Sequence, residues 1–202
     1  MAEGERFRLF VAVAVPDDVK AKLEAAQAEL RLMLPDRNVR WARREQFHLT
    51  LRFLGDVEAA RAEALAEAIR AACAGFGALH LRAEQIGCFP DRGYPRVVWV
   101  GVRDEAKQLP RLQLVVEAAT EGFTAEPKEE RFTGHLTLAR IKGIKRPEAE
   151  ALGKTAAGMA DRVFGQWTAY QIGLMRSELL PQGARHSSLA SIALTALPAD
   201  LA

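Results

Sequence analysis

Hydrophobic residues follow a strand-like pattern in several short segments of the chain. The first is Phe7–Val15, which is rich in Val, Phe and Leu and is bounded by Pro16. Short apolar runs that end at turn residues are typical of buried β-strands. The same pattern predicts further strands over Val39–Trp41, Phe47–Leu54, Leu79–Cys88, Arg96–Val102, Thr133–Ala139, Trp167–Arg176 and Leu189–Thr195.

Between these segments, apolar residues recur at the spacing of an α-helix. After Pro16, one apolar face is formed by Val19, Leu23, Ala26 and Leu30, and Pro35 is expected to end this helix. A turn at Gly55-Asp56 should precede a second helix over Val57–Cys73. Further helices are predicted through Leu109, Leu112, Val116 and Ala119, and over Pro147–Met159. Because strands and helices mix without strict alternation, the pattern favours one α+β domain, residues 1–202, with antiparallel sheet.

Composition adds mainly exclusions. Hydrophobic residues make up 49% and charged residues 27%, as in ordinary globular proteins. No run reaches the ~18 apolar residues of a membrane span, and Leu9–Val15 is too short for a signal-peptide core, so we expect a cytoplasmic protein with no membrane partner. The two cysteines, Cys73 and Cys88, fit neither a disulfide framework nor a metal site and are expected in or near the core. No cofactor is predicted, and we expect a monomer.

The strongest chemical signal is a repeated tetrapeptide. Two of the four histidines, His48 and His135, each begin the sequence H-L-T-L. Such a tetrapeptide is expected by chance about once in 10⁵ positions. Basic residues gather beside both copies, although the net charge of only +2 does not by itself indicate nucleic-acid binding. They are Arg37, Arg40, Arg43, Arg44 and Arg52 near the first copy, and Lys128, Arg131, Arg140, Lys142, Lys145 and Arg146 near the second.

The spacing within each copy places a histidine and a threonine on the same side of a strand. Successive side chains alternate faces, so His48 lies beside Thr50, and His135 beside Thr137, while the leucines point to the core. One such pair is more often a hydrogen-bonded structural pair, but two matched copies favour a functional site. If the strands face each other, two imidazoles and two hydroxyls surround one small volume.

This arrangement suits the opening of a cyclic phosphodiester by water. One imidazole can accept the proton of the water, and the other can protonate the leaving ribose oxygen, since histidine titrates near pH ~6.5. The threonine hydroxyls can donate to the non-bridging oxygens, where negative charge grows in the transition state. No metal is required, and no third ligand stands at a recognisable spacing from the histidines.

Four further residues are candidates for binding substrate. Arg52 is expected on the face of His48 and Thr50, where it could hold phosphate. Arg140 should point away from Thr137 in a regular strand, unless a bulge turns it round. Phe53 could stack on a base, although core packing is the default, and His186 could border the cleft.

The sequence resembles the two-histidine phosphoesterase superfamily. Within it, the chain is most similar to the RNA 2′,3′-cyclic phosphodiesterases, once named bacterial 2′-5′ RNA ligases. The segments that carry the resemblance span most of the chain and read R-L-F-V-A-V-A-V-P, V-R-W-A, F-H-L-T-L-R-F-L-G-D-V, P-R-V-V-W-V-G-V, G-H-L-T-L-A-R and L-M-R-S-E-L-L-P-Q-G-A-R-H. Two positions depart from the common pattern, since the family often has Pro where Gly134 stands and Tyr where His186 stands.

The resemblance implies a bilobal α+β fold of two antiparallel sheets flanked by helices, with the active site in the cleft between the lobes. It implies that His48, Thr50, His135 and Thr137 are catalytic. It also implies hydrolysis of a terminal 2′,3′-cyclic phosphate on RNA ends, or on nucleoside cyclic phosphates, to a 2′-phosphate. A 2′-5′ RNA ligase side activity is implied by the same family, with an RNA 5′-hydroxyl replacing water.

Two other functions remain open at this stage. The same constellation would serve another cyclic phosphate, such as a cyclic ADP-ribose phosphate, or a 2′-5′ oligoadenylate. A different class is an RNA-binding module without turnover, against which the paired H-x-T motifs argue strongly and the small net charge mildly. A turnover assay on a cyclic-phosphate nucleotide separates an enzyme from such a module.

Overall fold

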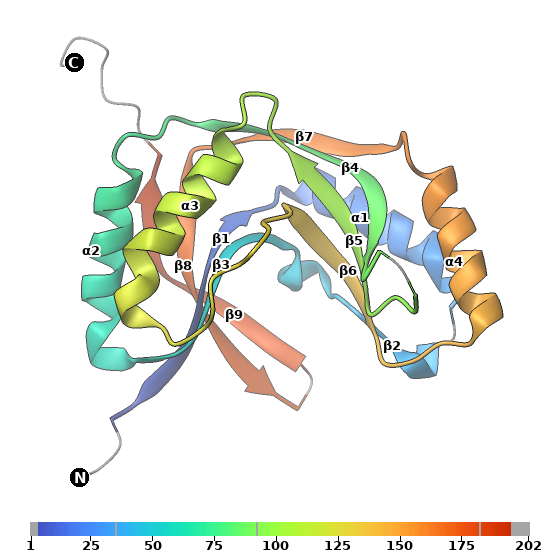
Figure 1. Ribbon diagram of the computed structural model, residues 1–202, viewed down its shortest axis with the longest axis horizontal. Coiled ribbons are helices and arrows are strands. Elements are labelled where there is room, and N and C mark those ends of the chain that lie inside the picture. The colour runs from blue at the N-terminus through green and yellow to red at the C-terminus, as the bar shows by residue number, and fades with distance from the viewer. Residues whose placement is uncertain (1–3, 35, 92, 182, 195–202) are drawn as a thin grey trace.

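Two antiparallel β-sheets with helices on their outer faces build the molecule (Figure 1). The computed structural model describes residues 4–34, 36–91, 93–181 and 183–194. We call the four-stranded sheet, with order β3-β1-β8-β9, sheet A; its strands are β1 (Arg6–Ala14), β3 (His48–Glu58), β8 (Gln171–Leu180) and β9 (Gly183–Ala193). Sheet B has the order β2-β6-β5-β4-β7; its strands are β2 (Val39–Trp41), β4 (Leu79–Phe89), β5 (Val97–Arg103), β6 (His135–Ile141) and β7 (Val163–Ala169).

Each sheet is covered by a pair of helices, one pair at each side of Figure 1. Helices α2 (Ala62–Cys73) and α3 (Gln108–Thr120) pack against each other and on sheet A, while α1 (Asp17–Arg31) and α4 (Arg146–Gly158) pack on sheet B. Short 3₁₀ helices cover Asp36–Asn38, Arg44–Gln46, Ala59–Arg61 and Glu121–Phe123. This is the predicted α+β architecture with two antiparallel sheets.

The chain passes repeatedly from one sheet to the other. Strand β1 lies in sheet A, but the next helix, α1, covers sheet B; β2 then joins sheet B, and β3 returns to sheet A. A buried side chain supports one of these crossings. Gln27 of α1, only 5% exposed, donates through Nε2 to the carbonyls of Ala42 and Leu138, both at 2.8 Å. The leucines of both H-L-T-L copies are at most 1% exposed and lie in one hydrophobic core.

Several predicted elements differ from the structure. The segment Trp167–Arg176, predicted as one strand, is divided at Tyr170: β7 ends in sheet B and β8 begins in sheet A. A single exposed residue suffices for this change of sheet, so the apolar run continues on both sides. The final predicted strand starts earlier, at Gly183, and its predicted end at Thr195 lies outside the described residues, as does Pro35.

The predicted turn at Gly55-Asp56 is also wrong. Strand β3 continues through both residues to Glu58, so α2 begins at Ala62 and not at Val57. Gly55 has a φ of +63° and lies beside a β-bulge opposite Leu9, where the strand bends without ending. Among the described residues, no helix is long and apolar enough to cross a membrane.

Candidate active site

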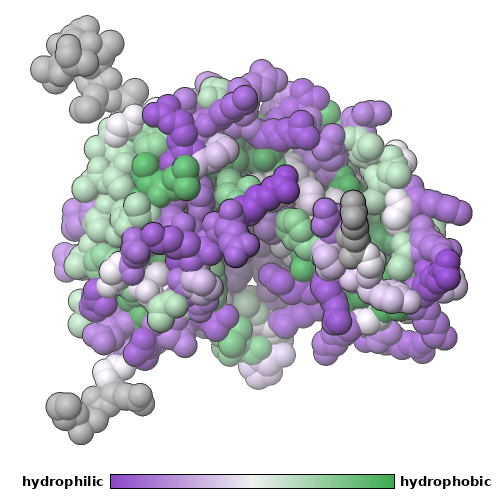
Figure 2. All heavy atoms as spheres, viewed as in Figure 1, coloured by the Kyte–Doolittle hydropathy of each residue, from purple (hydrophilic) through white to green (hydrophobic). Residues whose placement is uncertain are grey.

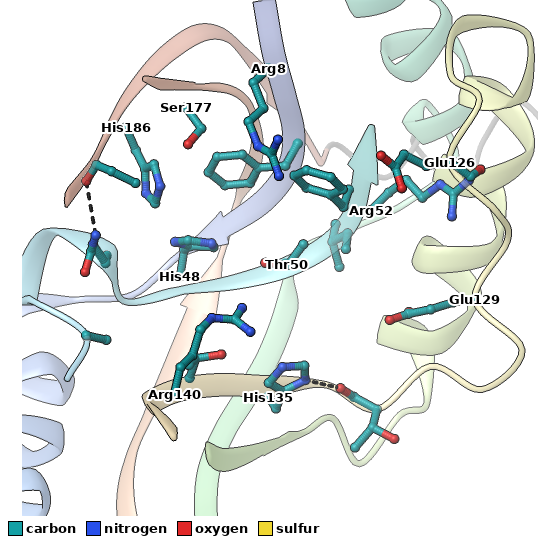
Figure 3. A pocket seen from close by; sticks show the side chains of 18 of the residues that line it. Arg8, His48, Thr50, Arg52, Glu126, Glu129, His135, Arg140, Ser177 and His186 are labelled. Atoms are coloured by element: carbon teal, nitrogen blue, oxygen red, sulfur yellow. Dashed lines mark hydrogen bonds between the residues drawn. The ribbon is translucent and has the colours of Figure 1, made fainter. Parts of the chain in front are cut away.

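A cavity of about 510 Å³ lies between the two sheets and takes its lining from both (Figure 3). In the space-filling view, hydrophilic side chains border the hollow in this face of the molecule (Figure 2). Strands β1, β3, β8 and β9 contribute from sheet A, and β2 and β6 from sheet B. All eight site residues chosen from the sequence line the cavity: His48, Thr50, Arg52, Phe53, His135, Thr137, Arg140 and His186.

His48 stands at the first residue of β3 inside a cluster of rings. Its centroid lies 4.7 Å from that of Phe10 on β1 and 5.0 Å from that of His186 on β9. Burial, followed by the nearby imidazole of His186, lowers the pKa of His48 to about 4, against a hydrogen bond to the backbone of Gln46. The His48 imidazole is therefore neutral at neutral pH.

His135 occupies the equivalent position at the start of β6. Its Nδ1 lies 2.7 Å from the carbonyl oxygen of Thr133, and its ring centroid lies 5.2 Å from Phe89 and 6.2 Å from Trp99. Burial lowers the pKa of His135, the bond to Thr133 opposes this, and the positive charge of Arg140 adds to the lowering.

The two histidines share one hydrogen-bonding pattern. Each ring bonds the backbone of the residue two positions before it, Gln46 for His48 and Thr133 for His135. A carbonyl acceptor fixes the proton on one ring nitrogen and leaves the other nitrogen for the cavity. The hydroxyls of Thr50 and Thr137 make no hydrogen bond to another described residue, so both can bind a ligand.

A β-bulge interrupts each motif at its second leucine. In the pairing with β1, Thr50 lies opposite Ala12 and Arg52 opposite Val11, which leaves Leu51 as the extra residue. In the pairing of β6 with β5, Thr137 lies opposite Trp99 and the next residue but one opposite Val98, which leaves Leu138 as the extra residue. An extra residue shifts the alternation of faces by one position.

The bulges change which flanking residues face the cavity. Phe53 and Arg140 turn toward the side of the threonines, whereas Arg52 and Ala139 turn to the buried side. The prediction that Arg52 shares the face of His48 is therefore wrong. For Arg140, the structure contains the bulge that was needed to turn this side chain toward Thr137.

Arg52 is buried among protein partners. It is 6% exposed, and its guanidinium donates to the carbonyls of Pro127 (2.6 Å) and Glu126 (2.9 Å). It also pairs with Glu117 of α3 at 3.5 Å. Glu117 in turn accepts from Gln113 Nε2 at 3.0 Å. Glu117 also accepts from the backbone N–H of Glu129 at 3.2 Å, so these contacts hold the segment 126–129, part of which lines the cavity, against α3 and β3.

His186 brings a third imidazole to the site. Its ring meets Phe10 edge-on at 5.0 Å, and its Nδ1 is buried without a hydrogen-bond partner among the described residues. Burial lowers its pKa. The start of β9 is fixed by Ala184, whose carbonyl accepts from Gln46 Nε2 at 3.1 Å. His186 therefore borders the cavity, as its place in the chain had suggested, and it also touches His48, which the sequence did not indicate.

The family model described as LigT like phosphoesterase matches residues 13–99 and 100–186, so that each match contains one H-L-T-L motif. The chain belongs to the LigT-like phosphoesterase family. Two curated relatives carry the name RNA 2′,3′-cyclic phosphodiesterase: one from Aeropyrum pernix, 37% identical over 72% of this chain and 80% of its own, and one from Archaeoglobus fulgidus, 31% identical over 90% and 97%.

Solved structures of LigT-like proteins share the fold. A crystal structure from Thermus thermophilus is 30% identical, with a TM-score of 0.74 over 93% of this chain and 97% of its own. Escherichia coli LigT complexed with 3′-AMP has the same TM-score over 95% and 99%, at 22% identity, and supports the fold alone. Among the described residues, no group of three or more His, Cys, Asp or Glu could hold a metal ion.

The sequence did not single out several residues that line this LigT-like cavity. Arg8 and Phe10 come from β1, and Arg8 stacks over the ring of Phe53 with its Cζ 4.8 Å from the centroid. Alternation within Phe7–Val15 places these two on one face, but the sequence does not say that β1 pairs with β3. The acidic side chains of Glu126 and Glu129 come from a loop without any pattern.

Proposed function

We propose that the chain is a metal-independent phosphodiesterase that hydrolyses the terminal 2′,3′-cyclic phosphate of RNA to a 2′-phosphate. The observation that carries the proposal is the pair of matched strands, each with an imidazole and a free hydroxyl, on opposite sheets around one cavity. The names of the curated relatives in the family agree with this activity. The substrate is an RNA end or a nucleoside cyclic phosphate.

His48 is the better candidate for the general base. A base must be neutral before the reaction, and the low pKa of His48 keeps it so. It takes a proton from the water that attacks phosphorus, while His135 gives a proton to the 3′-oxygen as the bond from phosphorus to that oxygen breaks. Thr50 and Thr137 donate hydrogen bonds to the non-bridging oxygens. Arg140 supplies positive charge near the same group, and Phe53 offers a ring face to a base.

The same geometry supports 2′-5′ RNA ligase side activity. An RNA 5′-hydroxyl can take the place of the attacking water, give its proton to His48 and form a 2′-5′ bond as the 3′-oxygen leaves. Because the attacking oxygen is the only difference, one set of residues serves both reactions. A cytoplasmic location and a monomeric state remain predictions.

The test is turnover of adenosine 2′,3′-cyclic phosphate and of an RNA oligomer that ends in a cyclic phosphate. We expect hydrolysis after exhaustive chelation, with 2′-phosphate as the product. His48→Ala and His135→Ala should each lower kcat by about 10²–10⁴, the usual worth of general acid–base catalysis. Thr50→Ala and Thr137→Ala should cost less, since water can partly replace a neutral donor. A folded histidine variant with near-normal kcat would rule out the two-histidine mechanism.

A substrate with a better leaving group assigns the two roles. It needs little help from a general acid, so it should partly rescue His135→Ala and leave His48→Ala slow. The opposite pattern of rescue would exchange the roles. The alternative substrates, a cyclic ADP-ribose phosphate and a 2′-5′ oligoadenylate, belong in the same assay, and faster turnover of either would move the physiological assignment to that class.

A further inference from the structure

Two arginines stand directly opposite each other at one end of the cavity. Arg40 on β2 and Arg140 on β6 are cross-strand partners, and both line the cavity. Like charges at directly opposite positions destabilise a sheet. Among the described residues, no carboxylate forms an ion pair with either guanidinium, although other arginines of the chain have such partners. This repulsion is relieved if an anion binds between the two side chains.

A third guanidinium comes from the loop after β2. Arg43 Nη2 and Arg40 Nη2 approach Gly183 so closely that a Cβ at this position would lie 3.2 Å and 3.1 Å from them. Arg43 Nη2 also donates to the carbonyl of Ala184 at 3.4 Å, which holds this arginine beside the β8–β9 hairpin. Like Arg40, Arg43 has no carboxylate partner among the described residues. We call Arg40 and Arg43 the arginine cluster; Arg40 lines the cavity and Arg43 stands beside it. Arg140, whose charge lowers the pKa of both His48 and His135, belongs to the site of the cyclic phosphate next to this cluster.

The arginine cluster lies at the opposite side of the cavity from its acidic residues. Figure 3 shows Arg140, which adjoins this cluster, on one side of the view and Glu126 and Glu129 on the other, with His135 and Thr50 between them. Phe53 and Phe132 also line the cavity, and they offer apolar surface to a nucleobase. Carboxylates repel a phosphate, so an anionic group of the substrate is directed toward the arginine cluster.

We propose that the arginine cluster is a second phosphate subsite, which binds the phosphodiester linking the terminal cyclic-phosphate nucleotide to the nucleotide before it. The inference rests on the proposed function and adds a requirement to it: the enzyme distinguishes the end of an RNA chain from a free cyclic mononucleotide. A mononucleotide has no such phosphodiester and leaves the subsite empty. Planar guanidinium groups suit this ligand because each can bind phosphate oxygens through two parallel hydrogen bonds.

The test compares adenosine 2′,3′-cyclic phosphate with the adenosine dinucleotide that ends in the same group. The measured quantity is the ratio of kcat/KM for the dinucleotide to kcat/KM for the mononucleotide. Arg40→Gln and Arg43→Gln should each lower this ratio about 10- to 100-fold, the usual worth of hydrogen bonds to a charged group. Arg37→Gln removes the same charge from an exposed position that neither lines the cavity nor, unlike Arg43, bonds to the described residues of β8 and β9, so it should leave the ratio unchanged.

A neutral linkage isolates the charge of the phosphodiester. With a methylphosphonate between the two nucleosides, the wild-type ratio should fall to the level of the variants, and Arg40→Gln and Arg43→Gln should lower it little further. An equal loss on both substrates, or an unchanged ratio in both variants, would overturn the subsite. These outcomes differ from failure of the proposed function, in which the wild type would turn over neither the mononucleotide nor the dinucleotide.

Discussion

His48 and His135 occupy matched positions but have unequal surroundings. His48 touches a second imidazole, that of His186, whereas His135 touches the uncharged rings of Phe89 and Trp99. Of two groups that transfer protons in opposite directions, one must be neutral and the other protonated, so they work best when their surroundings give them different pKa values. The asymmetry therefore comes from neighbouring strands, β9 on one side and β4 and β5 on the other, and not from the motifs.

We expect a bell-shaped pH profile of kcat/KM for cyclic-phosphate opening. The activity should rise as His48 loses its proton, near its pKa of about 4, and fall as His135 loses its proton, below that residue's ordinary value of 6.5. The maximum therefore lies on the acid side of neutrality. Initial rates at low substrate concentration across pH 3.5 to 9 measure this, since kcat/KM reports the free enzyme.

The corresponding profile of kcat should lie at higher pH. A bound phosphodiester is negatively charged and favours the protonated form of both imidazoles, so both limbs move upward in the complex. The two limbs belong to the pair, because interacting groups titrate together. A profile that rises throughout, without an alkaline limb, would argue against an acid histidine.

Replacing His186 tests the asymmetry directly. His186→Phe keeps a ring against His48 and Phe10 but removes the imidazole that lowers the pKa of His48. The acid limb of kcat/KM should move to higher pH, while the alkaline limb, which belongs to His135, stays in place. His80→Phe, at an exposed imidazole of β4 outside this cavity, is the matched control and should move neither limb. A shift of the alkaline limb alone would show that His48 is not the base.

The bulges at Leu51 and Leu138 divide each motif strand into two parts with different tasks. Before the bulge the two copies are identical and present a histidine and a threonine. After it they differ, because Phe53 and Arg140 face the cavity at equivalent positions while Arg52 and Ala139 face inward. A leucine in the sequence does not indicate a bulge, because each bulge arises from the pairing of the motif strand with β1 or β5. The H-x-T pairs could therefore be predicted from the sequence, and the orientation of Arg52 could not.

Arg52→Ala should mainly reduce stability. It would leave the carboxylate of Glu117 buried without its cationic partner, and we expect the free energy of unfolding to fall by about 3–5 kcal/mol. Adding Glu117→Gln should restore part of this loss, because it removes the uncompensated charge. Urea unfolding of the single and double variants measures both effects. Arg70→Ala, which breaks an exposed pair with Glu67, is a control expected to cost at most about 1 kcal/mol.

The competing role of Arg52 gives a different result. If its guanidinium bound the substrate phosphate, Arg52→Ala would raise KM strongly and leave the unfolding midpoint almost unchanged. The contacts of Arg52 with Glu126 and Pro127 predict a secondary rise in KM as well, because they hold a wall of the cavity. The size of the stability change therefore decides between the two roles.

At the scale of the whole molecule, the two sheets are not two consecutive halves of the chain. The family model matches residues 13–99 and 100–186, but each of these halves contributes strands to both sheets. The strands and helices could be predicted from their periodicity, whereas their assignment to sheets could not, as Trp167–Arg176 illustrates. Because the connections interleave, we propose that residues 1–202 form one bilobal domain that unfolds cooperatively.

The three tryptophans make this proposal testable without a label. Trp41, Trp99 and Trp167 all lie in sheet B, on β2, β5 and β7, so their fluorescence follows sheet B, while far-ultraviolet circular dichroism follows both sheets. We expect the two signals to change at the same temperature and the same urea concentration, with equal calorimetric and van 't Hoff enthalpies. Separate midpoints would show two independently unfolding units.

The shared hydrogen-bonding pattern of the two histidines has a consequence for successive turnovers. Both rings keep one nitrogen on a backbone carbonyl, so a single proton is exchanged at the other nitrogen of each. In the proposed reaction, His48 ends with a proton and His135 ends without the one that it began with. The enzyme that releases product is thus a protonation isomer of the enzyme that bound substrate. Solvent or buffer must return it to the starting form, so this reset is a distinct step in every catalytic cycle.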